Sequence, residues 1–131
     1  MANSKTKSKL LRRTRIRKGT MLFKERLLKK VLRGQKTQTR RTHKRTLKPG
    51  RVYGIRSSYF GKPEGHIKIL RTFKQRLGDI SLEDVQKEGF KTLEEFQREW
   101  IKINGKWDPN QTVTVYEFQI AEEKINQSKI S

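Results

Sequence analysis

The stretch RGQKTQTRR, residues 33–41, decides how the fold of this chain is interpreted. It sets four cationic side chains, Arg33, Lys36, Arg40 and Arg41, around a glycine, two threonines and two glutamines. Two kinds of chemistry use such a stretch. A lysine can activate a threonine hydroxyl for reaction, or a row of cations can hold a phosphate backbone.

The charge of the chain favours the second kind of chemistry. Its 131 residues include 33 Lys and Arg against 13 Asp and Glu, for a net charge of +20. Residues 1–51 hold 20 of these cations and one acid, Glu25, whereas residues 52–131 carry a net charge of only +1. A block of one sign repels itself unless a polyanion neutralises it. Nucleic acid is the predicted partner, and a membrane is not, because residues 1–19 lack a bulky apolar face.

The composition also excludes several classes of protein. The chain has no cysteine, so neither a disulfide framework nor a thiolate metal site is expected. His43 and His66 are the only histidines and have no second histidine at ligand spacing, so we expect no metal and no cofactor. No apolar run approaches the roughly 20 residues of a membrane span, and the N-terminus does not resemble a secretory signal. We therefore expect a cytoplasmic protein that requires no homo-oligomer.

The chain divides into three predicted parts. Residues 1–19 form a basic arm with eight cations and no acid, and too little apolar surface to fold alone. Residues 20–121 have the patterning of one globular domain. Residues 122–131 form a polar tail.

Within the globular part, helices are expected where apolar residues recur at helical spacing, around residues 24–33, 82–88 and 93–104. Ser81 and Thr92 precede the last two helices in capping-box spacing. Strands are expected around residues 36–42, 52–55, 65–73 and 112–120, where threonine, β-branched and aromatic residues gather. In the last strand the apolar face shifts between Val115 and Tyr116, which a bulge or burial on both faces would explain. The expected class is α+β, with a small barrel of about five strands and two to three short helices.

Residues 34–41 read as G-x-K-x-x-T-x-R, which resembles the signature of the ASCH domain family. Flanking features agree in order: a helix of the ERLLKKVLRG type before the signature, an LKPG turn after it, an acidic helix with KEGF, and a closing VYEF strand. The resemblance covers roughly residues 20–121. It implies a small barrel related to the PUA domain, which is an RNA-binding module.

The resemblance also implies an enzymatic alternative. Some small bacterial family members are amidohydrolases that deacetylate N4-acetylcytidine, and others are linked to RNA cleavage. The matching positions here are Lys36, Thr39 and Glu88. Against this alternative, a lysine and a threonine three residues apart on a strand point to opposite faces. In that interpretation Thr39 is an ordinary strand residue and Lys36 contacts phosphate.

We therefore predict an RNA-binding protein, with ribosomal RNA and neighbouring ribosomal proteins as partners, because long basic tails are typical of ribosomal proteins. The composition of the chain and the resemblance to this family favour an archaeal source. In the loop SSYFGKPEG, Tyr59 or Phe60 is a candidate for stacking on a base. The predicted phosphate contacts are Lys9, Arg12, Arg13, Arg15, Arg17, Lys18, Arg33, Lys36, Arg40, Arg41, Lys44, Arg45, Lys48 and Arg51.

Overall fold

The structure is a computed structural model that describes residues 19–43, 46–58 and 60–121. These residues form five strands, three α-helices and one short 3-10 helix, which confirms the predicted α+β class. In chain order the elements are β1 (Thr20–Leu22), α2 (Glu25–Leu32), β2 (Gln38–Arg41), β3 (Val52–Arg56), β4 (Gly65–Arg76), η1 (Leu77–Asp79), α3 (Leu82–Lys87), α4 (Leu93–Asn104) and β5 (Thr112–Ile120). No helix among the described residues is both long enough and apolar enough to cross a membrane. The predicted tail, and the predicted arm apart from Gly19, lie outside the described residues.

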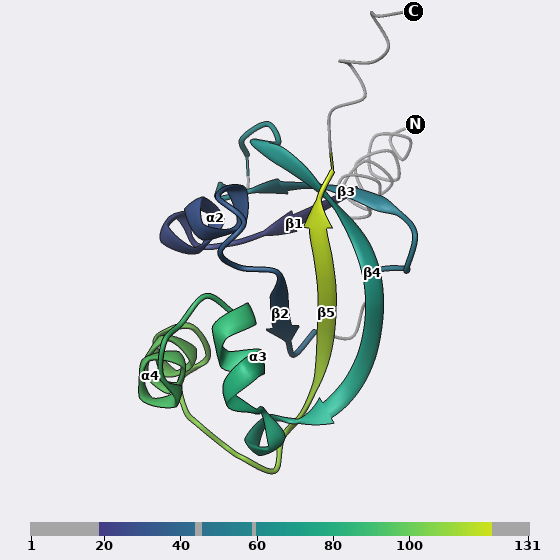
Figure 1. Ribbon diagram of the computed structural model, residues 1–131. Coiled ribbons are helices and arrows are strands. Elements are labelled where there is room, and N and C mark those ends of the chain that lie inside the picture. The colour runs from purple at the N-terminus through teal and green to yellow at the C-terminus, as the bar shows by residue number, and fades with distance from the viewer. Residues whose placement is uncertain (1–18, 44–45, 59, 122–131) are drawn as a thin grey trace, which may run out of the picture.

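All five strands belong to one mixed sheet, in the order β1-β3-β4-β5-β2. β1 pairs with β3 in parallel, and the other neighbours pair antiparallel. Figure 1 shows that the sheet is strongly curved, with β1 and β2 as its two edges. Arg41 Nη2 on β2 donates a hydrogen bond of 2.8 Å to the Leu22 carbonyl oxygen on β1. This contact links the two edges of the curved sheet.

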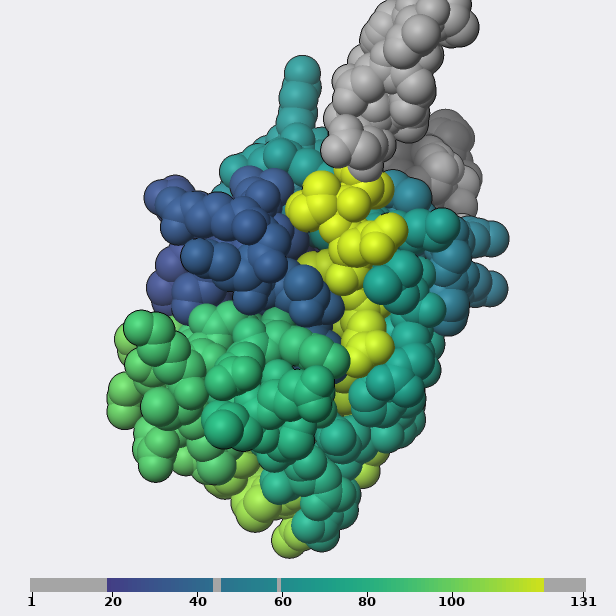
Figure 2. Space-filling model, viewed as in Figure 1, coloured from purple at the N-terminus to yellow at the C-terminus, as the bar shows by residue number. Residues whose placement is uncertain are grey.

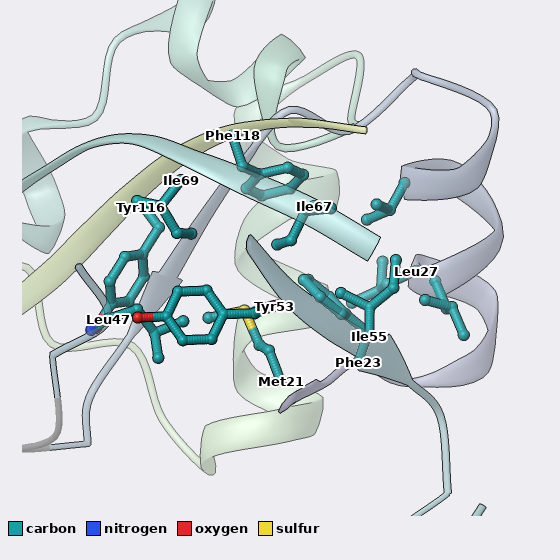
Figure 3. Packing of buried hydrophobic residues seen from close by; sticks show 12 residues of the cluster. Met21, Phe23, Leu27, Leu47, Tyr53, Ile55, Ile67, Ile69, Tyr116 and Phe118 are labelled. Atoms are coloured by element: carbon teal, nitrogen blue, oxygen red, sulfur yellow. The ribbon is translucent and has the colours of Figure 1, made fainter. Parts of the chain in front are cut away.

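Two clusters of buried apolar side chains lie along β5. The first joins α2 to the sheet and includes Leu27, Ile55 and Ile67 (Figure 3). The second lies under α3 and α4 and includes Phe96 and Trp100. The half-buried Phe90 packs against both clusters. The helices on the two sides therefore have separate cores, and Figure 2 shows α2 (blue) and the α3–α4 segment (green) meeting along a boundary.

The predicted helix boundaries are confirmed at their caps. The Ser81 hydroxyl accepts a hydrogen bond of 3.1 Å from the Asp84 backbone N–H at the start of α3. The Thr92 hydroxyl accepts one of 3.2 Å from the Glu95 backbone N–H at the start of α4. Gly34, just beyond α2, has a φ of 80°, a conformation that residues with a Cβ rarely adopt.

One strand of the sheet was not predicted from the sequence, and the structure decides between the two explanations that the sequence offered for another strand. β1 is not predicted, because three residues that pair in parallel with a distant strand carry no local pattern. For β5, burial on both faces explains the shifted pattern, since residues 113–116 are all buried. The irregularity in its pairing lies instead in β4, between Ile69 and Arg71.

Candidate functional site

The connection between α2 and β2 brings Lys36 against the end of α3. The Thr37 backbone N–H donates a hydrogen bond of 2.8 Å to the Lys87 carbonyl oxygen, which joins the two segments. Gly89 has a φ of 100°, and a Cβ at that position would lie 3.4 Å from the Lys36 Cβ. Glycine in the KEGF sequence thus ends α3 through its positive φ, and Lys36 lies at ordinary van der Waals distance from this position.

Lys36, Glu88 and Arg40 form a buried ionic cluster. Lys36 Nζ lies 2.6 Å from Glu88 Oε1, and Arg40 Nη1 lies 2.9 Å from Glu88 Oε2. The three side chains are 2%, 3% and 0% exposed, respectively. Burial lowers the pKa of Lys36 below the ordinary lysine value of 10.5, with a further contribution from Arg41, while Glu88 opposes the shift. Glu88 is therefore a carboxylate clamped between two cations.

Arg40 makes five hydrogen bonds through its guanidinium group. They go to Gln38 Oε1 at 2.6 Å, Glu88 Oε2 at 2.9 Å, Gln75 Oε1 at 3.2 and 2.9 Å, and Asp84 Oδ2 at 3.3 Å. A guanidinium has five N–H groups, so this set matches its full donor capacity. The sequence predicts phosphate contacts for Lys36 and Arg40, but the structure buries both side chains against protein partners.

Thr39 and Arg41 alternate along β2 with Gln38 and Arg40. Arg41 Nε donates to Thr39 Oγ1 at 3.2 Å, and the guanidinium lies 4.7 Å from the centre of the Phe23 ring. Burial lowers the pKa of Arg41 to about 10, against the attraction of Glu88, so the group is still cationic at neutral pH. Arg41 thus spans the seam between the sheet edges and also holds the Thr39 hydroxyl.

A cavity of about 430 Å³ lies beside this cluster. The three residues of the enzymatic alternative, Lys36, Thr39 and Glu88, all line it. Lys36 and Thr39 share the cavity, despite their spacing, because Lys36 lies before β2 begins and does not follow the alternation of the strand. Its aromatic lining residues are Phe23, His43, Phe90, Phe96 and Trp100. Aromatic rings beside convergent polar groups are typical of a small-molecule site, and the volume suits a nucleoside-sized group.

The other predicted phosphate contacts are distributed differently. Arg33, Lys48 and Arg51 are exposed. In the loop between β3 and β4, Phe60 is 90% exposed, whereas Tyr59 lies outside the described residues. Six contacts predicted for the arm and two for residues 44–45 also lie outside them, namely Lys9, Arg12, Arg13, Arg15, Arg17, Lys18, Lys44 and Arg45.

Sequence reasoning missed part of the site. Arg26 on α2 forms a two-point ion pair with Glu99 on α4, and Glu99 lines the cavity. Phe96 and Trp100 lie on the apolar face of α4; both are buried, and both also line the cavity. The helical spacing of these apolar residues predicts that they are buried. It does not predict that they line a cavity, because the opposite wall comes from a distant segment of the chain. In the described residues no group of three or more His, Cys, Asp or Glu side chains could hold a metal ion.

The fold and the cavity together define a small α+β domain with a ligand-sized site at the seam of a curved sheet. A family model described as the ASCH domain matches residues 19–122. The chain therefore belongs to the ASCH domain family, which is a PUA-like, RNA-binding fold family.

Solved structures of bacterial proteins share this fold. An ASCH domain from Lactobacillus crispatus has 17% sequence identity and a TM-score of 0.60, with 78% of each chain covered. Protein EF3133 from Enterococcus faecalis has 17% identity and a TM-score of 0.62, over 85% of this chain and 80% of that one. A mutant of the ZmASCH protein from Zymomonas mobilis has 11% identity and a TM-score of 0.57, over 76% and 67%. A sequence search of curated proteins gives no match.

Proposed function

We propose that this protein binds RNA and takes one unstacked nucleotide into the cavity. The observation that carries the proposal is the composition of the cavity, in which aromatic side chains face the polar side chains of Lys36, Thr39 and Glu88. Proteins recognise single-stranded RNA by stacking splayed bases on aromatic rings and by hydrogen bonding to the base edges. A net charge of +20 supplies the attraction to the RNA backbone.

In this proposal the exposed cations Arg33, Lys48 and Arg51 contact the phosphates of the RNA backbone outside the cavity. Such contacts give affinity and orientation but little sequence information. The cavity supplies the selective part of the interaction. We leave Lys36 and Arg40 out of the proposed phosphate contacts, because both side chains donate hydrogen bonds to buried protein partners.

Neutralising Arg33, Lys48 and Arg51 one at a time with glutamine should weaken binding to unrelated single-stranded RNAs by similar factors. Each lost phosphate contact should reduce the slope of log affinity against log salt by about 0.7–0.9. Fluorescence anisotropy over a salt series measures this slope. Lys106→Gln removes the same charge from an exposed position beyond α4 and is the matched control. Slopes that match the control for all three variants would refute the proposed contacts.

We propose that the RNA bound by this protein is ribosomal RNA. This step rests on the composition of residues 1–19. A role on the ribosome would also place the protein in the cytoplasm. Extended basic arms can thread between RNA helices, and arginines in them can bridge phosphates. This arm has eight cations and no acid, a charge pattern suited to such contacts.

Removing residues 1–19 should sharply reduce co-sedimentation with ribosomal subunits at moderate salt, while the melting temperature of the domain stays nearly unchanged. Sucrose-gradient sedimentation of the full and truncated chains tests this prediction. The ribosomal assignment fails if the truncated chain sediments as well as the full chain, or if neither does. Binding to free RNA would then be the better account.

A second candidate function is hydrolysis of an acylated base, as in the N4-acetylcytidine amidohydrolases of the family. The observation that favours it is the meeting of Lys36, Thr39 and Glu88 in one cavity. In its neutral form Lys36 could take the proton of the Thr39 hydroxyl as that oxygen attacks the acetyl carbonyl. The proton held by Lys36 would pass to the exocyclic nitrogen as the carbon–nitrogen bond breaks and cytidine leaves. Water, deprotonated by the neutral Lys36, would then hydrolyse the acetyl ester of Thr39 to release acetate and restore the hydroxyl. Release of acetate from N4-acetylcytidine measures this activity.

A further inference from the structure

Arg41 is a half-buried cation of the site that forms no ion pair with a carboxylate of the described residues, and Glu88 attracts it from beyond ion-pair distance. Lys36 and Arg40 both pair with Glu88, and Arg40 also pairs with Asp84. Among the described residues, Arg41 donates only to the neutral oxygens of Thr39 and Leu22. Three of its five N–H groups remain without a hydrogen bond there.

The guanidinium of Arg41 is nevertheless half-buried and held in place. Its stacking on Phe23 and its two hydrogen bonds fix the plane of the group. A buried charge normally has a partner of opposite sign, because its removal from water is unfavourable. A fixed, half-buried guanidinium on the wall of a cavity, without a hydrogen-bonded carboxylate, is thus prepared for an anion that the described residues do not supply.

The charge balance of the cavity points the same way. Its lining includes four basic residues, Lys24, Lys36, Arg40 and Arg41, and two acidic ones, Glu88 and Glu99, and both acidic residues already form ion pairs with basic ones. The aromatic groups of α4 form another part of the lining. A ligand that satisfies both regions has an anionic group joined to a flat apolar ring.

We infer that Arg41 binds a phosphate group within the cavity, so that the ligand is a nucleotide and not a neutral nucleoside. The inference rests on the proposed nucleotide-binding function and specifies which part of the nucleotide is recognised. A guanidinium suits this role because its planar fork can donate two parallel hydrogen bonds to phosphate oxygens.

Isothermal titration of the full chain with nucleosides and their monophosphates tests this inference. The 3′- and 5′-monophosphates of cytidine, uridine, adenosine and guanosine are each compared with the parent nucleoside, and inorganic phosphate is used as a competitor. At least one monophosphate should bind roughly tenfold to hundredfold more tightly than its nucleoside, as expected of hydrogen bonds to a charged group. The 3′ and 5′ series show which phosphate reaches Arg41.

Two variants locate the effect. Arg41→Gln should remove the preference for the monophosphate, whereas Arg98→Gln, which removes the same charge from an exposed position of α4 outside the cavity, should keep it. Equal affinities of the intact chain for nucleoside and monophosphate would overturn the inference, and so would equal behaviour of the two variants. If Arg41→Gln does not fold, because it also links the sheet edges, the comparison in the intact chain and the competition by phosphate decide. If nucleosides, nucleotides and RNA all fail to bind, the proposed function itself is wrong.

Discussion

Replacing Arg40 with alanine is expected to lower the free energy of unfolding by about 3–5 kcal/mol, the range for breaking a buried ion pair. The Arg40 side chain is fully buried and bonds four other residues through five hydrogen bonds. Its removal leaves Glu88 with one cation instead of two and leaves the buried Gln38 amide oxygen without its donor. Unsatisfied buried polar groups are costly because they have lost water without gaining a partner.

Thermal unfolding followed by circular dichroism measures this effect. A loss of 3 kcal/mol should lower the melting temperature by roughly 12 °C or more in a domain of this size. Arg51→Ala, at an exposed position, is the matched control and should change stability by no more than about 0.5 kcal/mol. Arg40→Lys should remain destabilised, because an ammonium group cannot reproduce the planar fork. If Arg40→Ala melts like the control but binds RNA more weakly, Arg40 contacts phosphate after all.

If the cavity is catalytic, Thr39→Val should reduce release of acetate from N4-acetylcytidine by at least about a hundredfold, because it removes the nucleophile. Lys36→Met should reduce it by about 10²–10⁴-fold, the usual contribution of a general base. Thr112→Val and Lys106→Met are controls with the same chemical change at exposed positions. Thr39→Val should still bind the ligand, because valine keeps the shape of threonine.

The dependence of the rate on pH gives a second test of the role of Lys36. Burial lowers the pKa of Lys36, so its neutral form accumulates as the pH rises through that lowered value. The rate should therefore rise with pH and level off below pH 10.5, the ordinary lysine pKa. Lys36→Arg should lose this rise. Unchanged turnover in Thr39→Val and Lys36→Met would exclude the proposed chemistry and leave the cavity as a binding site.

Local sequence patterns were sufficient for most of the secondary structure. Ser81 and Thr92 marked the starts of α3 and α4, because a side-chain cap acts on backbone groups only three residues away. β1 could not be predicted in this way, since its pairing partner begins more than 30 residues later and its three residues make no periodic pattern. The contribution of α4 to the cavity was missed for a similar reason. The cavity forms only where α4 meets residues that are distant in the sequence, and the pattern of α4 alone does not indicate those residues.

The sequence by itself determined the excess of positive charge, the family signature and the α+β class. It could not separate Arg40 from Arg41, which are adjacent in the signature and chemically identical. The tertiary structure decided their roles, because successive side chains of a strand point to opposite faces. Arg40 meets Glu88, 48 residues later in the chain, and is enclosed. Arg41 meets the edge of β1 and the cavity, where no carboxylate of the described residues forms a hydrogen bond or ion pair with it.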